Sequence, residues 1–168
     1  MSDYPKWLPN LVFFEKYNCD WKQYIEVIYK IFRQDFVESY NYFDGKRVSI
    51  KRKPFEQEKE ATFWHLISED SGKSGNEDER TPDFRRCERI GWPKPIMENS
   101  DDPQIKFWKN IRKGEKNIIL WFNDEYLVVL SERLDYLLFK TAFCKNEVPV
   151  SSGPKEGQTS LIETTSIP

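Results

Sequence analysis

The C-terminal half of the chain contains three β-type runs that are separated by very short connections. The runs are "NIILWF", "EYLVVLS" and "DYLLFKTAF", and the connections between them are "ND" and "ERL". Strands joined by so few residues must turn back on one another, because a parallel connection needs about a dozen residues or more. The sequence therefore predicts an antiparallel meander, and any fold for this chain has to accommodate it.

Upstream of the meander, the patterns favour helices and one hairpin. Residues 20–36 form an amphipathic helical pattern, with Asp20 available as the N-cap. The dipeptide Asp44-Gly45 lies between two β-prone runs and predicts a hairpin turn. Helical patterns return over residues 55–68 and over "PDFRRCERI", where Pro82 can occupy the first turn. That last helix should stop near Pro93 and Pro95.

These patterns together predict an α+β fold, with N-terminal helices packed on an antiparallel sheet of about five strands. The polar stretch from Glu69 to Thr81 predicts a mobile surface loop. Residues 148–168 are rich in Ser, Thr, Pro and Gly and have no apolar period, so we expect a disordered C-terminal tail.

The bulk composition excludes several classes of protein. A formal net charge of −2 excludes a uniformly basic nucleic-acid coat and leaves only local basic patches. The three cysteines, Cys19, Cys87 and Cys144, are far apart in the chain and predict reduced thiols in a cytoplasmic protein. With one histidine and no clustered cysteines, we expect no metal site and no cofactor. No apolar run approaches the roughly 20 residues that cross a bilayer, so we expect neither export nor membrane insertion.

The single histidine, His65, lies within "ATFWHLISED". Histidine is the side chain whose ordinary pKa lies near neutrality, so a lone copy is the obvious candidate for moving protons at physiological pH. On a helix the ring would lie at the border of the buried stripe, beside Trp64 and Phe63. A histidine that merely stacks on the rim of the core fits the same geometry.

The segment "RRCERI" supplies Arg85, Arg86 and Arg89, with Glu88 among them. The i and i+4 spacing of Arg85 and Arg89 puts both on one helical face, where two guanidinium groups could bind a phosphate. A solvated helix face with ion pairs is the structural alternative.

Two further basic clusters occur in the chain, and the first of them contains no acidic residue. In "KRVSIKRK", strand alternation would place Arg47, Lys51 and Lys53 on one face, as a row that matches a nucleic-acid backbone. The second cluster surrounds Trp108 and Phe107, a mixture of cations and aromatic rings that single-stranded RNA can use. It consists of Lys106, Lys109, Arg112, Lys113 and Lys116. Both clusters could equally be solvated faces or edges that block aggregation.

The last β-type run offers another candidate phosphate site. Alternation assigns Thr141 to the face of Leu137 and Phe139, and Arg133 lies in the preceding turn. A strand-end hydroxyl and an arginine are suitable phosphate ligands, although each could simply stabilise the turn.

Long parts of the chain resemble the phage-associated branch of the BECR superfamily, which groups barnase, EndoU, colicin nuclease and RelE toxin folds. The similar segments are "KRKPFEQEKEATFWHLISED", "ERTPDFRRCERIGWPKPIMEN" and "IKFWKNIRKGEKNIILWFNDEYLVVLSERLDYLLFKTAF". The distinctive motifs are F-W-H-L, P-D-x-R-R-C-E-R-I, and L-V-V-L followed by T-A. The resemblance covers about residues 40–144. It divides the chain into an N-terminal helical extension (1–39), a BECR-like nuclease domain (40–147) and the tail (148–168).

This resemblance implies a toxin-like or phage-related endoribonuclease that needs no metal. Cleavage of RNA without a metal requires a base for the 2′-hydroxyl, an acid for the leaving 5′-oxygen, and cations for the phosphate oxygens. His65 would be base or acid, and Glu88 its complement. Arg85, Arg89 and Arg133 would stabilise charge, and Thr141 would hydrogen-bond the phosphate. The other predicted phosphate ligands are Arg86, Arg47, Lys51 and Lys53.

The sequence also departs from the family pattern, and other functions remain open. Family members usually continue past T-A with basic sequence, whereas this chain continues into "CKNEVPVSSGPKEGQ" and the neutral tail. One alternative is a non-catalytic RNA- or protein-binding module on the same fold. Another is an interaction protein whose aromatic N-terminal helix docks onto a partner. RNA is the expected partner, with an antitoxin or host protein as a second one, and no membrane.

Overall fold

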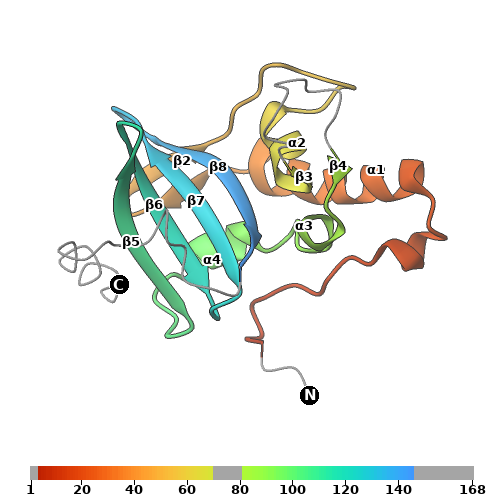
Figure 1. The fold of residues 1–168 in the computed structure, drawn as a ribbon, viewed down its shortest axis with the longest axis horizontal. Coiled ribbons are helices and arrows are strands. Elements are labelled where there is room, and N and C mark those ends of the chain that lie inside the picture. Colours follow the sequence, from red (N-terminus) through yellow and green to blue (C-terminus); the bar gives the residue numbers. More distant parts are fainter. Residues whose placement is uncertain (1–3, 70–80, 146–168) are drawn as a thin grey trace.

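The computed structural model describes residues 4–69 and 81–145 (Figure 1). The predicted tail therefore lies outside the described residues, as does the predicted loop from Glu69 to Thr81 except for its two ends. Helices and a curled sheet make up the chain, which confirms the predicted α+β class. Within the described part of the chain, no helix is long and apolar enough to span a bilayer.

The main sheet has six strands in the order β1-β2-β8-β7-β6-β5. Its members are β1 (Asn41–Phe43), β2 (Lys46–Ser49), β5 (Ile105–Arg112), β6 (Glu115–Phe122), β7 (Tyr126–Glu132) and β8 (Leu137–Cys144). Strands β6, β7 and β8 pair antiparallel, which confirms the predicted meander. Strands β1 and β2 form the predicted hairpin, and the left-handed backbone of Asp44 and Gly45 makes its turn.

The sheet differs from the expected five antiparallel strands in two respects. Strand β5 adds a sixth member, which alternation did not reveal because its exposed positions, Lys106, Lys109, Ile111 and Arg112, do not follow a period of two. Strands β2 and β8 pair in parallel, with Val48 opposite Leu137. The parallel pair forms because the chain leaves β2 through the helices and three further strands before it returns as β8.

Helix α1 (Trp21–Phe32) is the longest helix, and the side chain of Asp20 caps it by accepting from the Lys22 N–H. It continues as a π-helical segment, Arg33–Val37, and a short 3-10 helix, Phe14–Tyr17, precedes it. The shorter elements are α2 (Ala61–Ile67), β3 (Ser68–Glu69), β4 (Thr81–Pro82), α3 (Phe84–Glu88) and α4 (Pro93–Glu98). In Figure 1, α1, α2 and α3 gather beside the end of β8.

Two predicted helix boundaries were wrong. Helix α2 begins at Ala61 instead of residue 55, because the chain turns between Glu56 and Lys59 with left-handed backbone at the two residues between them. Pro82 belongs to strand β4, and Asp83 caps α3 by accepting from the N–H groups of two arginines. Helix α3 ends at Glu88, before the two prolines as predicted, and Pro93 begins helix α4, as proline at a first helical position can.

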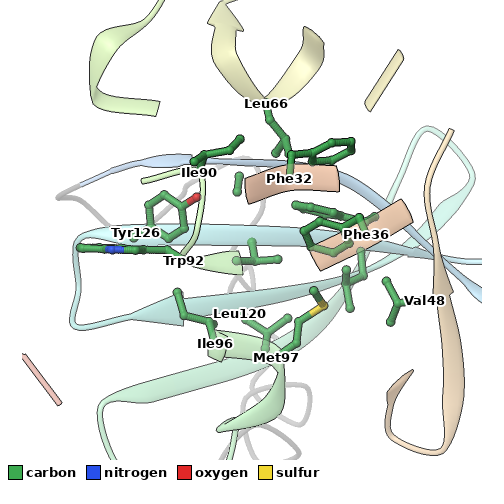
Figure 2. Close-up of a cluster of buried hydrophobic side chains, with 14 of the residues drawn as sticks. Phe32, Phe36, Val48, Leu66, Ile90, Trp92, Ile96, Met97, Leu120 and Tyr126 are labelled. Carbon is green, nitrogen blue, oxygen red and sulfur yellow. The ribbon is translucent and has the colours of Figure 1, made fainter. Parts of the chain in front are cut away.

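One hydrophobic core joins the helices to the sheet (Figure 2). Phe32 and the π-helical Phe36 meet Phe139 of β8, with the rings of Phe36 and Phe139 4.8 Å apart. Helix α4 adds Ile96 and Met97 beneath the central strands. The predicted division between residues 39 and 40 stays a prediction, although residues from both sides of it fill this core.

The opposite face of the sheet carries a second, smaller apolar cluster. It consists of Trp108, Ile119, Trp121 and Leu127, with Val129 and Phe143 packed against it. Trp108 is buried here against Trp121. The prediction that cations surround a Trp108 ring on which RNA bases could stack is therefore wrong. The ring is buried in the second apolar cluster instead.

A β-bulge in β8 changes which residues face this second side. Phe139 pairs with Leu130 and Thr141 pairs with Val129, so Lys140 is an extra residue in β8. Phe139 and Ala142 both face the main core, which leaves Lys140 and Thr141 together on the other face. The prediction that Thr141 shares a face with Leu137 and Phe139 was therefore wrong.

Candidate functional site

A cavity of about 610 Å³ lies where α2 and α3 meet strand β8. Its walls come from segments that are far apart in the sequence. The lining residues are Lys51, Thr62, His65, Ser68, Arg86, Glu115, Arg133, Leu138, Phe139, Lys140, Thr141 and Phe143.

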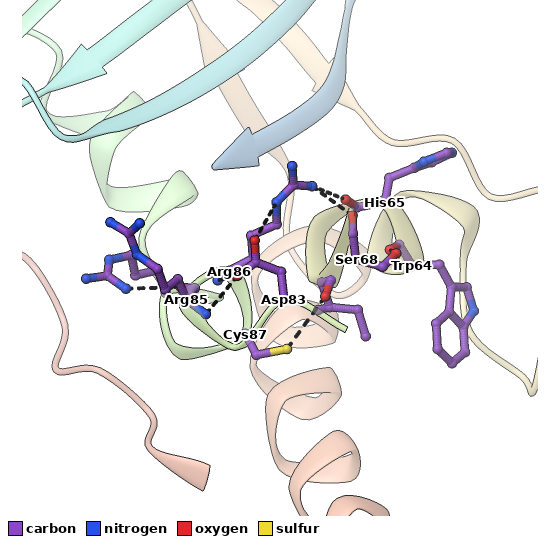
Figure 3. Close-up of polar contacts among 9 residues, drawn as sticks. Trp64, His65, Ser68, Asp83, Arg85, Arg86 and Cys87 are labelled. Carbon is purple, nitrogen blue, oxygen red and sulfur yellow. Dashed lines mark hydrogen bonds and ion pairs between the residues drawn. The ribbon is translucent and has the colours of Figure 1, made fainter. Parts of the chain in front are cut away.

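His65 enters this cavity from helix α2, and its side chain is exposed to solvent. Its neighbours Leu66 and Ile67 are buried, so the imidazole lies at the border of the apolar stripe as predicted. Figure 3 shows the ring projecting away from helix α3. The first turn of α2 is held in place because Thr62 exchanges hydrogen bonds with the backbone of Lys51.

Arg86 joins helix α3 to the end of helix α2 (Figure 3). Its Nη1 donates to the backbone oxygens of His65, at 3.1 Å, and Ser68, at 2.8 Å. Its Nε lies 3.6 Å from the Asp83 carboxylate, and its guanidinium carbon lies 5.3 Å from the centre of the Phe143 ring. These contacts fix a positive charge at the cavity wall beside the backbone that carries His65.

Glu115 organises two more cations on the opposite wall. Lys140 Nζ donates to its Oε2 at 2.6 Å, and Arg133 Nη2 donates to its Oε1 at 3.4 Å. Arg133 Nη1 also donates to the Ser131 hydroxyl at 2.6 Å. The hydrogen bond and charge of Lys140, aided by Arg133, lower the pKa of Glu115 below its ordinary value. The carboxylate is therefore ionised at neutral pH and holds both cations at the cavity.

The charges of the lining give the cavity a positive character. Four cationic side chains, Lys51, Arg86, Arg133 and Lys140, face one carboxylate, Glu115. The hydroxyls of Thr62, Ser68 and Thr141 add neutral hydrogen-bonding groups. A cavity with this balance suits an anionic ligand such as a phosphate.

Five of the predicted site residues meet in this cavity. They are His65, Arg133, Thr141, Arg86 and Lys51. The sequence did not single out Lys140 or Glu115. The bulge that brings Lys140 to the cavity leaves no local sequence signal. Glu115 lies at the start of β6 and reaches Lys140 only because the sheet brings β6 and β8 close together.

The other five predicted residues do not line it. Arg85 and Arg89 lie on a different side of α3, where Arg89 donates to the Arg85 backbone oxygen and stacks on Trp92. Glu88 lies 3.5 Å from the same Arg89 guanidinium, and its partial burial raises its pKa. The short helix α3 can turn only one of its arginines, Arg86, toward α2.

The expected row of Arg47, Lys51 and Lys53 on one strand face was also wrong. Strand β2 ends at Ser49, so strand alternation does not reach the two lysines. Arg47 lies 4.6 Å from the centre of the Tyr40 ring, and of the two lysines only Lys51 reaches the cavity.

Two further depressions adjoin the cavity and share parts of its lining. One, of about 460 Å³, shares Lys51 and Leu138 and is lined in addition by Tyr40, Tyr136, Arg47 and Arg52, among others. The second, of about 270 Å³, shares Glu115, Lys140, Thr141 and Phe143. Because each depression shares lining residues with the cavity, the three hollows are together called the groove.

Among residues 4–69 and 81–145, no three His, Cys, Asp or Glu side chains cluster as metal ligands would. None of the protein-family models, curated proteins and solved structures compared with this chain matches it.

Proposed function

We propose that this protein is a metal-independent endoribonuclease that cleaves RNA by general acid–base transesterification. The observation that carries the proposal is a cavity lined by His65, which is exposed to solvent, together with four cationic side chains and Thr141.

The chemistry of RNA cleavage accounts for this combination of groups. A base removes the proton of the 2′-hydroxyl, whose oxygen then attacks the adjacent phosphorus while the bond to the 5′-oxygen breaks and that oxygen takes up a proton. His65 would serve one of these two proton transfers. Arg86, Arg133 and Lys140 would stabilise the charge that develops on the phosphate oxygens, and Thr141 would donate a hydrogen bond to them.

The groove on either side of the cavity favours a polymer over a small anion. The depression beyond Lys51 offers the exposed aromatic rings of Tyr40 and Tyr136 together with Arg47 and Arg52. Aromatic rings beside cations are suited to bases and phosphates of a single strand.

A non-catalytic RNA-binding module is the second candidate, and one observation favours it. The predicted complement Glu88 does not line the cavity, and Glu115, which does, is bound by Lys140 and Arg133. Neither carboxylate is therefore placed to serve as the second proton-transfer group beside His65.

We also propose that the enzyme acts in the cytoplasm as a toxin-like or phage-related nuclease, with an antitoxin or host protein as a further partner. Support for the cytoplasm as the compartment comes from Cys19, Cys87 and Cys144, none of which forms a disulfide.

Cleavage of total RNA by the purified full chain in EDTA tests the proposal. His65→Ala should lower the rate by at least about 100-fold, because general acid–base catalysis contributes that much or more. Its unfolding midpoint should stay close to that of the wild type, since the ring is exposed. Lys22→Ala, on an exposed lysine of α1 that lines none of the three hollows, is the control and should cleave normally.

Three results would contradict the proposal. Wild-type protein that binds RNA in a salt-sensitive manner and forms no product would favour the binding module. Cleavage by His65→Ala at the wild-type rate would remove His65 from the mechanism. Complete loss of activity in EDTA, with recovery on adding a divalent cation, would refute metal independence.

A further inference from the structure

Two asparagines face each other in the smaller hollow that adjoins the cavity. Asn110 of β5 and Asn117 of β6 are directly opposite in the sheet register, and both are buried. Asn117 Nδ2 donates to Asn110 Oδ1 over a long 3.4 Å. The side-chain amide oxygen of Asn117, Oδ1, has no hydrogen-bond partner, although the residue is only 7% exposed.

A buried amide oxygen without a partner is costly in a folded protein, by about 1–3 kcal/mol. Asn117 lines the 270 Å³ hollow, so a ligand seated there can supply the missing donor. A role in joining β5 to β6 accounts for the hydrogen bond between the two amides, but it does not account for the unpaired oxygen of Asn117. The unpaired oxygen therefore points to a ligand with an N–H group.

The other walls of this hollow suit a flat aromatic ligand. Ile119, Val129 and Phe143 supply apolar surface, and the hollow is also lined by Arg112, at the end of β5, and Lys113, in the turn that follows. The hollow shares Lys140 and Thr141 with the main cavity. A base seated beside Asn117 would thus belong to a nucleotide whose phosphate lies near Lys140.

We propose that this hollow is a nucleobase subsite that prefers adenine to uracil, an inference that rests on the proposed function. An asparagine amide pairs with adenine through two hydrogen bonds, accepting from N6 and donating to N7. Asn117 has the required groups, since its Oδ1 is unpaired and only one of its two Nδ2 hydrogens is directed to Asn110. Uracil lacks the 6-amino group and the N7 acceptor, so it cannot form the same pair.

Fluorescence anisotropy with labelled 2′-fluoro hexanucleotides tests this subsite without cleavage, because the probes lack the attacking 2′-hydroxyl. Wild-type protein should bind the adenine hexamer about tenfold more tightly than the uracil hexamer, the discrimination that one bidentate pair provides. Probes with 7-deazaadenine or purine in place of adenine should lose most of that difference. Asn117→Ala should lower the affinity for the adenine hexamer to that for the uracil hexamer.

The outcomes separate this inference from the proposed function. Equal affinity of the wild type for adenine and uracil hexamers would overturn the adenine subsite and leave RNA binding intact. No binding of any hexamer at low salt would overturn both. If Asn117→Ala fails to fold, the wild-type comparison of adenine with its two analogues still decides, since equal affinities for all three would overturn the subsite.

Discussion

At the scale of single residues, the central group of the site is a carboxylate rather than the histidine. Glu115 contacts Lys140 and Arg133, and both cations line the same cavity as His65. Its pKa is lowered, chiefly by the hydrogen bond from Lys140, so the pairs are lost at a lower pH than an ordinary carboxyl group would allow. They are lost only when the pH falls through the lowered pKa of the folded protein.

Replacing Glu115 with Gln tests whether this carboxylate positions the two cations. We expect kcat for RNA cleavage to fall about tenfold, because the cations lose their fixed positions. We expect the affinity for RNA at low salt to rise, because the cavity loses its one negative charge. Separate measurement of kcat and KM distinguishes the expected fall in kcat from the expected rise in affinity. An unchanged kcat would show that Glu115 does not position the cations.

Asp35 links the stability of the fold to pH. Burial raises its pKa to about 6 from an ordinary 3.8, although nearby Lys94 opposes the shift and Glu98 adds to it. Between these two pH values the folded chain binds more protons than the unfolded chain, so the free energy of unfolding should fall as the pH rises. Asp35→Asn should remove this dependence and stabilise the protein above pH 6, on the order of 1 kcal/mol.

Chemical denaturation of wild type and Asp35→Asn at several pH values measures this effect. Identical pH profiles for the two proteins would show that the Asp35 carboxyl is not perturbed in the fold.

At the scale of elements, the bulge in β8 decides what the strand presents to the cavity. Without the extra residue, Phe139 and Ala142 would face the core with only Thr141 between them on the other side. With it, Lys140 and Thr141 both reach the groove. Bulges are common beside active sites, because they redirect side chains in this way.

Deleting Lys140 should therefore be tolerated by the fold, since regular alternation would then place Phe139, Thr141 and Ala142 on their present faces. Deleting Leu138 is the control and should unfold the protein, because it would make the core residues Leu137 and Phe139 adjacent in the strand. Circular dichroism and thermal unfolding distinguish the two variants. Unfolding of both would show that the bulge itself is needed for the sheet.

At the scale of the whole molecule, the N-terminal helix and the sheet share one core. Phe32 of α1 is fully buried, and its ring lies 5.4 Å from that of Phe63 in α2 and 5.5 Å from that of Phe36. The helix that bears His65 is thus packed against α1, which lies before the segment, about residues 40–144, that resembles the BECR superfamily. The shared core makes the position of the candidate site depend on the whole described chain.

Phe32→Ala should lower the free energy of unfolding by about 3–5 kcal/mol, the usual cost of removing a buried phenylalanine ring. Phe55→Ala is the matched control, because Phe55 is 54% exposed, and it should change stability by less than about 1 kcal/mol. Both variants should unfold in a single transition when followed by far-UV and by tryptophan signals. Separate transitions would indicate that α1 and the sheet form independent units.

The sequence by itself determined the elements whose signals are local. Short connections require the β6-β7-β8 meander, Asp44-Gly45 requires the hairpin turn, and the apolar period with Asp20 defines α1. It also placed His65 at the border of a buried helix face. Each of these inferences depends on residues within a few positions of one another, where sterics and hydrogen bonding act directly.

Only the tertiary structure decided which side chains converge. The bulge moves Thr141 to the face opposite Phe139, the sheet brings Glu115 to Lys140, and the packing of α3 selects Arg86 while Arg85 and Arg89 point elsewhere. Pairing register and helix packing join residues that are distant in the chain, and their energies come from burial and hydrogen bonds that exist only in the folded molecule. A single extra residue in β8 is enough to reassign a face, and for this reason the site could be predicted only in part.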